Sequence, residues 1–323
     1  MSAPSKPDVL AVAKLHPFFR QALDRLYTVH DRTHELDPTA FEALAPHIVG
    51  VAATGEARVP RPLLEQLSAA RVVSVFGVGY DGVDVAAAIE RGVPVTHTPG
   101  VLSDDVADMA MALVLGIARR VPEGDRYVRE GRWPGGPLAL GRKVSGARMG
   151  IVGMGRIGQA IARRASAFGM PIAYTARSAK ADLPWSFVSN AVALAQQSDF
   201  LVVITPGGAG TRHLINANVL AALGPNGYLI NVARGSVVDE EALICALRDG
   251  TIAGAGLDVF ANEPQVPEAL RQLPNVVLSP HTASATAQTR QDMADLAFAN
   301  LRAGIGGQPL ITPVPEWVVA RGK

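Results

Sequence analysis

Short apolar runs rich in β-branched residues alternate with helical patterns through the second half of the chain. The runs predict six strands, at 148–152, 171–175, 200–204, 228–232, 253–258 and 276–279, with helices near 156–168, 191–197, 216–222 and 239–248. Strands that alternate with helices form a parallel sheet with crossover helices. This alternation is the strongest constraint on the fold, and it predicts an α/β domain with a doubly wound sheet.

The N-terminal part repeats the alternation on a smaller scale, with strands expected near 9–13, 48–52, 72–75 and 93–96. Because 323 residues exceed one ordinary core, we expect two domains. The last long helical pattern, at 286–304, is expected to return to the first unit. The sequence therefore predicts two Rossmann-like domains: a discontinuous one of residues 1–98 plus 285–323, and one of residues 99–284.

Charge and hydropathy limit the partners of the chain. Lys and Arg number 30 against 29 Asp and Glu, a net charge of +1, which supplies no long-range field for nucleic acid or an anionic membrane. The longest apolar run, Met109–Ala118, is shorter than the roughly 20 residues that cross a bilayer and predicts a buried helix. The first residues lack a basic start with a continuous apolar stretch. We expect a soluble, cytoplasmic protein with no nucleic-acid or membrane partner.

Cysteine and histidine provide no pattern typical of a metal site. The single cysteine, Cys245, excludes an internal disulfide and a zinc site of several thiolates. Because cysteine is among the most buried residue types, we expect its side chain to be buried in a helix. Histidines outside the motifs below show no ligand spacing and are expected to be structural or exposed: His16, His30, His34, His47 and His213. We expect no metal cofactor.

Basic residues concentrate between 119 and 148. They are Arg119, Arg120, Arg126, Arg129, Arg132, Arg142, Lys143 and Arg148. Glu123, Asp125 and Glu130 dilute them, and only Tyr127 and Trp133 supply aromatic rings, so a nucleic-acid surface is disfavoured. We expect a solvated face or an arm that contacts another subunit.

A glycine pattern follows the first strand of the second unit. Gly153-Met154-Gly155-Arg156-Ile157-Gly158 matches G-x-G-x-x-G between a predicted strand and a predicted helix. The glycines permit a tight turn, close approach of the backbone to a pyrophosphate and close packing of helix on strand. The phosphates would meet free N–H groups at the positive end of the helix. The pattern predicts a dinucleotide site.

The end of the second strand indicates which dinucleotide binds. An acidic residue about 20 positions on would bind the ribose 2′-OH of NAD, whereas an arginine accommodates the extra phosphate of NADP. Here Ala176, Arg177, Ser178 and Lys180 follow the strand, and no carboxylate occurs before Asp182. Arginine pairs with phosphate through two donors. We expect NADP(H) to be preferred, with NAD(H) possible, and a solvated loop is the alternative.

Three later strands are each followed by one ionisable group. Arg234 lies in NVARG, Glu263 in GLDVFANEP and His281 in SPHT. A guanidinium binds a carboxylate and its neighbouring carbonyl, an imidazole exchanges protons near neutral pH, and a carboxylate bonded to the imidazole fixes its tautomer. Together with a nicotinamide site, these groups indicate carbonyl reduction of a 2-oxo acid.

These motifs resemble those of the D-isomer-specific 2-hydroxyacid dehydrogenase family, most closely its glyoxylate/hydroxypyruvate reductase branch. The resemblance rests on GMGRIG, SDFLVVITP, NVARGSVVDE, GLDVFANEP and NVVLSPHTASAT, and in the first domain on VFGVGYD at 75–81 and the crossover at Pro99-Gly100. The sequence departs from the family at His97, where asparagine is usual, and at Ala261-Asn262, where an acidic residue is common.

The resemblance implies an active site in the interdomain cleft and roles for individual residues. Arg234 would bind the substrate carboxylate and carbonyl oxygen, His281 would donate the proton, and Glu263 would pair with His281. Other substrate-binding residues would be Ala53, Thr54, Val78, Gly79 and Trp133, the last reaching the neighbouring subunit of a homodimer. Cofactor contacts would come from Gly153, Met154, Gly155, Arg156, Ile157, Gly158, Ala176, Arg177, Ser178, Lys180, Thr205, Pro206, Val232, Ala233, Asp258, His281 and Ser284. For three of these positions a role without function is the alternative: a structural Asp258, a core Trp133 and an ordinary turn at 53–55.

The implied function is NADPH-preferring reduction of small 2-oxo acids, glyoxylate to glycolate and hydroxypyruvate to D-glycerate. Another dehydrogenase of the same family, of the phenylpyruvate, hydroxyphenylpyruvate or phosphoglycerate type, is an alternative. A formate-type enzyme is disfavoured by Glu263. A protein that senses the dinucleotide without turnover is a further alternative, which the intact set of Arg234, Glu263 and His281 disfavours.

Overall fold

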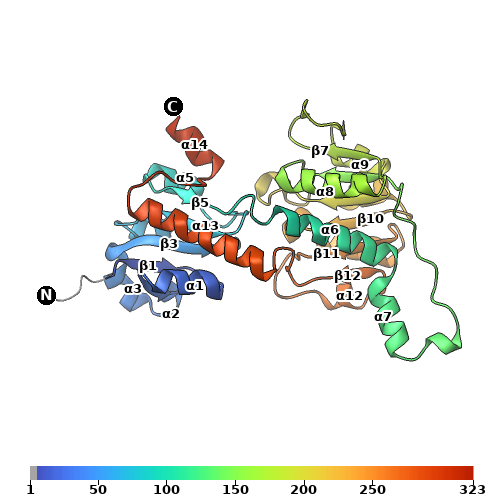
Figure 1. Ribbon diagram of the computed structural model, residues 1–323, viewed down its shortest axis with the longest axis horizontal. Coiled ribbons are helices and arrows are strands. Elements are labelled where there is room, and N and C mark those ends of the chain that lie inside the picture. Colours follow the sequence, from blue (N-terminus) through green and yellow to red (C-terminus); the bar gives the residue numbers. More distant parts are fainter. Residues whose placement is uncertain (1–5, 323) are drawn as a thin grey trace. The chain divides into compact units, whose positions relative to one another are not determined.

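The computed structural model describes residues 6–322. The chain forms two compact units, one made of Met1–Leu102 with Ala285–Lys323 and the other of Ser103–Ser284. In Figure 1 the first unit carries the blue and red ends of the chain, and the second carries the green to orange middle. Each unit is a parallel sheet with its own helices. The predicted α/β class with two doubly wound sheets is confirmed.

Unit 1, as we call Met1–Leu102 with Ala285–Lys323, has a five-stranded sheet in the order β2-β1-β3-β4-β5. Its strands are β1 Asp8–Ala11, β2 Thr28–Asp31, β3 Ile48–Thr54, β4 Val73–Phe76 and β5 Val95–Thr96. Its helices are α1 Pro17–Asp24, α2 Thr33–Leu36, α3 Pro38–Leu44, α4 Arg61–Gln66, α5 Val85–Glu90, α13 Ala287–Ile305 and α14 Pro315–Arg321, with a 3-10 turn η1 at Ala45–His47. The strand order reverses between β1 and β3, as in flavodoxin-like sheets.

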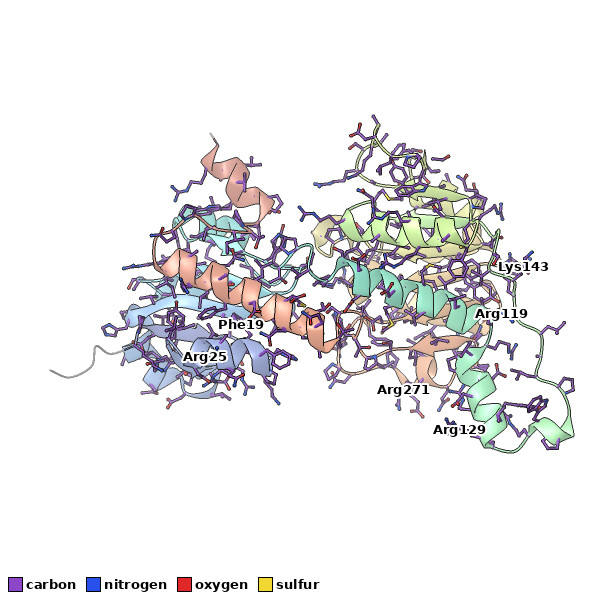
Figure 2. The ribbon with its side chains drawn as sticks, viewed as in Figure 1. Phe19, Arg25, Arg119, Arg129, Lys143 and Arg271 are labelled. Carbon is purple, nitrogen blue, oxygen red and sulfur yellow. The ribbon has the colours of Figure 1, made fainter. Side chains whose placement is uncertain are left out.

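Helix α13 belongs to unit 1 although it lies near the end of the sequence. It packs on α1 and on β4, and the Ser74 hydroxyl in β4 donates to the Ala297 carbonyl at 2.8 Å. Figure 2 labels Phe19 of α1, whose side chain is fully buried in this unit. The C-terminal helix therefore returns to the N-terminal sheet, and unit 1 is made of two separate segments of the chain.

Unit 2, residues Ser103–Ser284, has a seven-stranded sheet in the order β12-β11-β10-β9-β6-β7-β8. Its strands are β6 Met149–Val152, β7 Ile172–Thr175, β8 Ser186–Phe187, β9 Phe200–Val203, β10 Tyr228–Asn231, β11 Gly254–Leu257 and β12 Val276–Leu278. Its helices are α6 Ser103–Ala118, α7 Val121–Arg129, α8 Arg156–Ala167, α9 Ala191–Gln196, α10 Ala217–Leu223, α11 Glu240–Arg248 and α12 Glu268–Arg271, with 3-10 turns η2 Trp133–Gly135, η3 Ala209–Thr211 and η4 Gly235–Val237. All of its strand pairs are parallel.

The strand order of unit 2 reverses between β6 and β9, which are neighbours. Open α/β sheets bind ligands beyond the carboxyl ends of their strands at such a reversal. The carboxyl end of β6 leads directly into Gly153 and the glycine motif. Helix α6 packs on α8 and on β10, β11 and β12, which explains why the run Met109–Ala118 is apolar on most of its faces.

The segment between α6 and β6 leaves the body of unit 2 as an arm, which we define as residues 119–148. Figure 2 labels Arg119 at its start, Arg129 at the end of α7 and Lys143 on the returning chain. It exposes four large apolar side chains: Val121, Val128, Trp133 and Leu140. Helix α7 was not expected, because its proline and glycine made the segment look irregular. A core position for Trp133 is wrong, since the side chain is 67% exposed.

Two further differences from the sequence prediction have local causes. Strands β2 and β8 were missed because β2 is polar and half-exposed and β8 has only two residues. The predicted burial of Cys245 is wrong: it lies on the exposed face of α11, where Arg248 Nη2 donates to its Sγ at 3.3 Å. Leu243, Ala246 and Leu247 form the buried face instead. No helix among residues 6–322 is long and apolar enough to cross a membrane.

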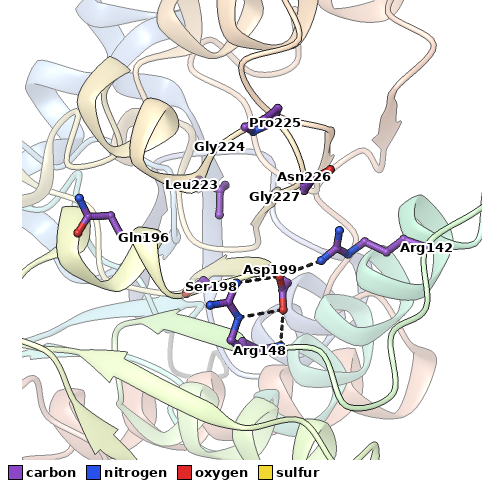
Figure 3. Close-up of a pocket in the computed structure, with 10 residues that line it drawn as sticks. All are labelled: Arg142, Arg148, Gln196, Ser198, Asp199, Leu223, Gly224, Pro225, Asn226 and Gly227. Carbon is purple, nitrogen blue, oxygen red and sulfur yellow. Dashed lines mark hydrogen bonds and ion pairs between the residues drawn. The ribbon is translucent and has the colours of Figure 1, made fainter.

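Asp199 anchors the arm at the amino ends of the strands. Its carboxylate accepts hydrogen bonds from Arg142 Nη2 at 2.8 Å and from the Arg148 backbone N–H at 2.8 Å (Figure 3). Arg148 Nη2 and Nε also donate to it, at 3.1 and 3.2 Å. These groups line a cavity of about 240 Å³ next to the carboxyl ends of α9 and α10, where positive charge is favourable. The hydrogen bond from Arg148 holds the pKa of Asp199 below its usual range.

Asp199→Asn tests this anchor. A carboxylate with a lowered native pKa stabilises the fold above its unfolded pKa and loses that contribution as pH falls through the native value. We expect the substitution to lower the free energy of unfolding at pH 7 by about 1–3 kcal/mol. The difference from wild type should shrink as pH falls through the acidic range, which urea unfolding at several pH values measures.

The matched control is Asp249→Asn, because Asp249 is 65% exposed and makes only a 3.6 Å ion pair with Arg248. A change of no more than about 0.5 kcal/mol is expected there. Equal effects of the two substitutions at pH 7 would contradict the anchoring role.

Candidate active site

The glycine motif has the backbone that a dinucleotide turn requires. Gly153 has φ of 105°, and a Cβ there would lie 2.8 Å from the Ile204 carbonyl oxygen. A Cβ on Gly158 would overlap the Gly153 carbonyl. Beside Gly155, which precedes the first turn of α8, a Cβ would meet nothing within 4 Å. The turn is therefore tight on the protein side and open at the helix N-terminus, so these residues fit a pyrophosphate.

The residues expected to select the dinucleotide follow β7. Ala176 is half-buried, and Arg177, Ser178 and Lys180 are exposed. The Lys180 backbone N–H donates to the Tyr174 hydroxyl at 2.8 Å, which holds the loop against the sheet. Within the described part of the chain, no carboxylate forms an ion pair with Arg177. Its guanidinium is thus available for a phosphate.

Arg234 stands after β10 on a loop that Asn231 shapes. Asn231 is buried, and its Oδ1 accepts the Ala233 N–H at 3.0 Å while its Nδ2 donates to the Arg234 carbonyl at 3.1 Å. Arg234 Nη1 donates to the Ala233 carbonyl at 2.7 Å, and the arginine is half-buried. Asn231 was missed from the sequence, although an asparagine at the end of an apolar strand pattern was a usable signal.

The Arg234 loop packs on the loop that carries Glu263. A Cβ on Gly235 would overlap the Phe260 backbone, so only glycine allows this approach. Glu240 Oε2 accepts the Ala261 N–H at 3.1 Å and holds the same loop from α11. Glu240 was also missed, because nothing in the run VVDEE distinguishes it from a solvated helix residue.

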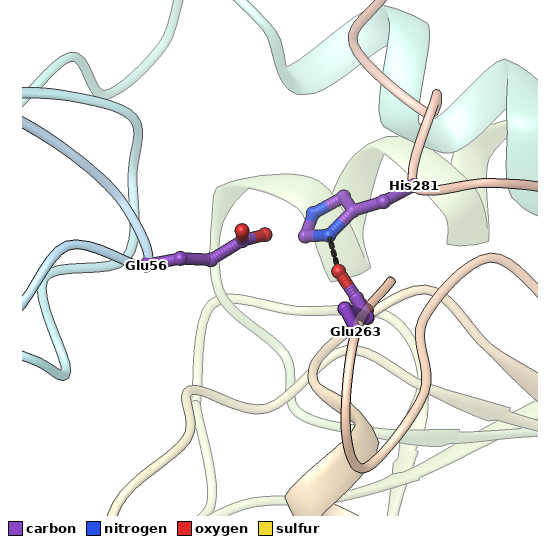
Figure 4. A group of neighbouring side chains, drawn as sticks. All are labelled: Glu56, Glu263 and His281. Atoms are coloured by element: carbon purple, nitrogen blue, oxygen red, sulfur yellow. Dashed lines mark hydrogen bonds and ion pairs between the residues drawn. The ribbon is translucent and has the colours of Figure 1, made fainter. Parts of the chain in front are cut away.

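His281 and Glu263 form a hydrogen-bonded pair. His281 Nδ1 donates to Glu263 Oε2 at 2.6 Å, as the dashed line in Figure 4 shows. The other oxygen of Glu263 accepts the Phe260 N–H at 2.8 Å, so the carboxylate is held on two sides. Because an ionised carboxylate only accepts, Nδ1 carries the hydrogen in this pair. The pair thereby fixes the tautomer and the direction of the imidazole.

Asp258 determines the backbone that presents His281. Its side chain is fully buried, and its two oxygens accept the N–H groups of Thr282 and Ala283, each at 2.9 Å. Its carbonyl accepts the His281 N–H at 2.8 Å. His281 adopts φ of 52°, a left-handed conformation rare for a residue with a side chain. Asp258 therefore has the structural role left open by the sequence, and a cofactor contact by it stays a prediction.

In unit 1 the expected carboxylate loop is held by the residues after β5. Gly77 donates its N–H to Thr98 Oγ1 at 3.1 Å, and Thr98 donates its N–H to the Gly77 carbonyl at 2.8 Å. His97 Nδ1 bonds the Val78 carbonyl at 2.8 Å. The histidine that replaces the usual asparagine thus takes part in hydrogen bonding at this hinge. Ala53 is buried, and Thr54, Val78 and Gly79 are half-buried.

The remaining predicted residues lie on loops of unit 2. Thr205 and Pro206 follow β9, Val232 and Ala233 follow β10, and Ser284 ends the loop after β12. Trp133 lies in the turn at the tip of the arm, where the Tyr127 hydroxyl donates to the Gly136 carbonyl at 2.9 Å. The parallel sheet thus brings the residues after β6, β9, β10, β11 and β12 to one edge.

Comparison with known proteins agrees with this geometry. The family model for "D-isomer specific 2-hydroxyacid dehydrogenase, NAD binding domain" matches residues 111–283. A hydroxyphenylpyruvate reductase of Plectranthus scutellarioides is 46% identical over 95% of this chain and 98% of its own. A glyoxylate/hydroxypyruvate reductase A of Arabidopsis thaliana is 48% identical over 83% of this chain and 84% of its own. The crystal structure of an NADPH-dependent glyoxylate/hydroxypyruvate reductase of Sinorhizobium meliloti, in complex with NADP and malonate, covers 97% of this chain and 98% of its own at 45% identity and a TM-score of 0.91.

Fold and site together define an oxidoreductase that uses a nicotinamide dinucleotide. The chain belongs to the D-isomer-specific 2-hydroxyacid dehydrogenase family. A reductase acting on 2-oxo acids, the substrates that give 2-hydroxy acids, is therefore supported, and several of its relatives are named glyoxylate/hydroxypyruvate reductases. The family membership predicted from the motifs is confirmed.

Asp258→Asn tests the structural role of the buried carboxylate. In the wild type both carboxylate oxygens of Asp258 accept a backbone N–H. The substitution replaces one oxygen by an amide NH₂, which cannot accept, so one buried hydrogen bond is lost. We expect the free energy of unfolding to fall by about 1–3 kcal/mol. We also expect kcat to fall, because the loop that carries His281 shifts. Thermal unfolding and initial rates measure both, with Asp249→Asn as the exposed control. Loss of cofactor affinity alone, at full stability, would argue for a direct cofactor contact instead.

Proposed function

We propose that the chain reduces small 2-oxo acids with NADPH, converting glyoxylate to glycolate and hydroxypyruvate to D-glycerate. The observation that carries this proposal is the 2.6 Å hydrogen bond between His281 and Glu263 at the sheet edge that also carries Arg234 and the glycine motif. The names of the glyoxylate/hydroxypyruvate reductases among the relatives support the substrate class.

The chain's own residues account for binding and proton transfer. Arg234 binds the substrate carboxylate and carbonyl oxygen through its planar guanidinium. The N–H groups of Val78 and Gly79 bind the carboxylate, and Ala53 and Thr54 line its surroundings. A nicotinamide dinucleotide held at the glycine motif would supply the hydride that reduces carbon 2. His281 donates a proton from Nε2 to the carbonyl oxygen, while Glu263 stabilises the protonated imidazole. Because Arg234 and His281 stabilise the developing alkoxide, the mechanism needs no metal ion.

The proposed cofactor contacts follow the edge of the sheet in unit 2. The motif from Gly153 to Gly158 holds the pyrophosphate at the N-terminus of α8. Arg177, Ser178 and Lys180 bind the 2′-phosphate beside Ala176. The other contacts are Thr205, Pro206, Val232, Ala233, Asp258, His281 and Ser284. Binding of NADP by the Sinorhizobium meliloti relative supports the NADPH preference.

We also propose a role for each domain and an oligomeric state. Residues 1–98 with 285–323 form the substrate-binding domain and residues 99–284 the NAD(P)-binding domain. The protein is a homodimer in which the arm carries Trp133 to the substrate site of the neighbouring subunit. The exposed apolar side chains of the arm support a partner surface, since Trp133 is 67% and Leu140 95% exposed.

A second candidate is reduction of an aromatic 2-oxo acid, which the 46% identical hydroxyphenylpyruvate reductase favours. Initial rates of NADPH and NADH oxidation with glyoxylate, hydroxypyruvate, pyruvate and phenylpyruvate separate the candidates. Highest kcat/KM for glyoxylate or hydroxypyruvate supports the proposal, and highest kcat/KM for phenylpyruvate supports the second candidate. Tight NADPH binding without turnover of any 2-oxo acid would indicate a protein that only senses the dinucleotide.

Arg177→Asp tests the cofactor preference. Removing the phosphate-binding cation and adding a carboxylate for the ribose hydroxyl should raise the KM for NADPH and lower the KM for NADH. Initial rates with each cofactor measure both effects. Arg163→Asp, an equal change of charge at an exposed position of α8, is the control. A similar change of both KM values in Arg177→Asp would refute the assignment.

His281→Ala tests the proton donor. Loss of a general acid lowers kcat by a factor of about 10² to 10⁴. We expect a loss in that range, with a much smaller change in the dissociation constant of NADPH measured by fluorescence titration. His47→Ala removes an exposed histidine of unit 1 and should leave kcat as it is. An unchanged kcat in His281→Ala would remove His281 from the mechanism.

A further inference from the structure

A cluster of aromatic and basic side chains lies at the carboxyl edge of the unit 1 sheet. It consists of His16, Phe76 and Arg290, from the loop after β1, the end of β4 and the first turns of α13. The strand order of this sheet reverses between β1 and β3, and such a reversal opens a crevice beyond the carboxyl ends of the strands. The cluster thus occupies the edge at which a sheet of this type binds ligands. Sequence reasoning assigned His16 no more than a structural or exposed position.

The ring of Phe76 lies at the centre of the cluster, and three side chains pack on it. The His16 ring stacks on it with centroids 5.6 Å apart and planes 6° apart. Phe19 stacks on it at 5.9 Å, and the Arg290 guanidinium carbon lies 5.7 Å from its centroid. The stacked arrangement fixes the directions of His16 and Arg290. It also leaves less of the Phe76 ring for stacking with an aromatic ligand.

The protonation state of His16 makes it a hydrogen-bond donor without a charge. Its Nδ1 accepts the Phe18 N–H at 3.4 Å, so the hydrogen of the neutral ring is on Nε2. Burial, and to a lesser degree the charge of Arg290, hold the pKa of His16 below its usual range. The cluster therefore combines an N–H of a neutral imidazole with a guanidinium, two groups that donate to oxygen.

The cluster lies beside the groups proposed to bind the substrate carboxylate. Phe76 is the register partner of Thr54 across β3 and β4, and it directly precedes the loop Gly77-Val78-Gly79. A small 2-oxo acid whose carboxylate binds to this loop would extend its remaining carbon atoms over the same edge.

We propose that Arg290 and His16 form a specificity subsite that binds oxygen atoms carried by the substrate beyond carbon 2. The proposal rests on the proposed function. Of its two substrates the subsite favours hydroxypyruvate, which carries a hydroxyl on carbon 3, over glyoxylate, which has no carbon 3. Pyruvate has no such oxygen for either donor to bind. Phenylpyruvate brings an apolar ring to the same donors. The site therefore discriminates by hydrogen bonding rather than by size alone.

Hydroxypyruvate and pyruvate form the matched pair for the test, because they differ only in one hydroxyl group. We expect kcat/KM of the wild type to be higher for hydroxypyruvate. Arg290→Met, which keeps length and removes the donors, should lower the ratio of the two kcat/KM values by about tenfold, the worth of one hydrogen bond to a charged group. The loss should be mainly in KM for hydroxypyruvate. Arg290→Lys should restore part of it, and Arg302→Met on the exposed face of the same helix should retain the wild-type ratio.

His16→Phe tests the second donor, since the phenyl ring keeps the stacking on Phe76 and removes the N–H. We expect the same ratio to fall, with thermal unfolding measured alongside because His16 also caps α1. Oxaloacetate, whose distal oxygens form a carboxylate, tests the shared chemistry: a larger loss in Arg290→Met for oxaloacetate than for hydroxypyruvate assigns the subsite to anionic substituents, and a smaller loss assigns it to hydroxyl groups.

Two outcomes would overturn the subsite while the proposed function stands: a wild type that reduces pyruvate as efficiently as hydroxypyruvate, or variants that lower both kcat/KM values by the same factor. Absence of turnover by the wild type with every 2-oxo acid and both cofactors would instead refute the proposed function. The two failures are therefore distinguishable in one set of assays.

Discussion

The geometry of the candidate site in unit 2 depends on the hydrogen bonds of one buried carboxylate, that of Asp258. A carboxylate without solvent must accept hydrogen bonds, and this one accepts two backbone N–H groups of the segment after β12. Its own backbone carbonyl accepts the N–H of His281. These bonds join the ends of β11 and β12 and hold His281 in a left-handed conformation. The direction of the imidazole is therefore determined by buried backbone contacts, and Glu263 then fixes its tautomer.

The same principle applies to the neighbouring loops, each of which is held by polar contacts that bury backbone groups. Asn231 shapes the loop of Arg234, and Gly235 permits that loop to touch the backbone at Phe260. Glu240 holds the next residue of the Phe260 loop from α11. Because the strands are parallel and adjacent, every one of these loops leaves the sheet at the same edge. The sheet supplies the proximity, and the buried hydrogen bonds supply the orientation.

The sequence predicted the regular part of the fold well and the irregular part less well. Strands with strong apolar runs, such as β6 and β9, were placed within a residue or two, because burial on both faces leaves a clear pattern. The polar β2, the two-residue β8 and the arginine-rich α7 carry no such pattern and were missed. Cys245 was predicted to be buried from its residue type alone, whereas the rotation of α11 turns it to solvent.

The sequence by itself determined the family, the parallel α/β class and the identity of the ionisable groups, because glycine spacing, strand periodicity and the three motifs are local properties of the chain. Only the tertiary structure decided which polar groups hold those residues in place. Glu240 acts on a backbone N–H 21 positions away, and the carboxylate of Asp258 acts on backbone N–H groups 24 and 25 positions away. The stacking of His16 and Arg290 on Phe76 joins residues more than 200 positions apart in the sequence. Such contacts depend on the packing of whole elements, and no local pattern encodes them.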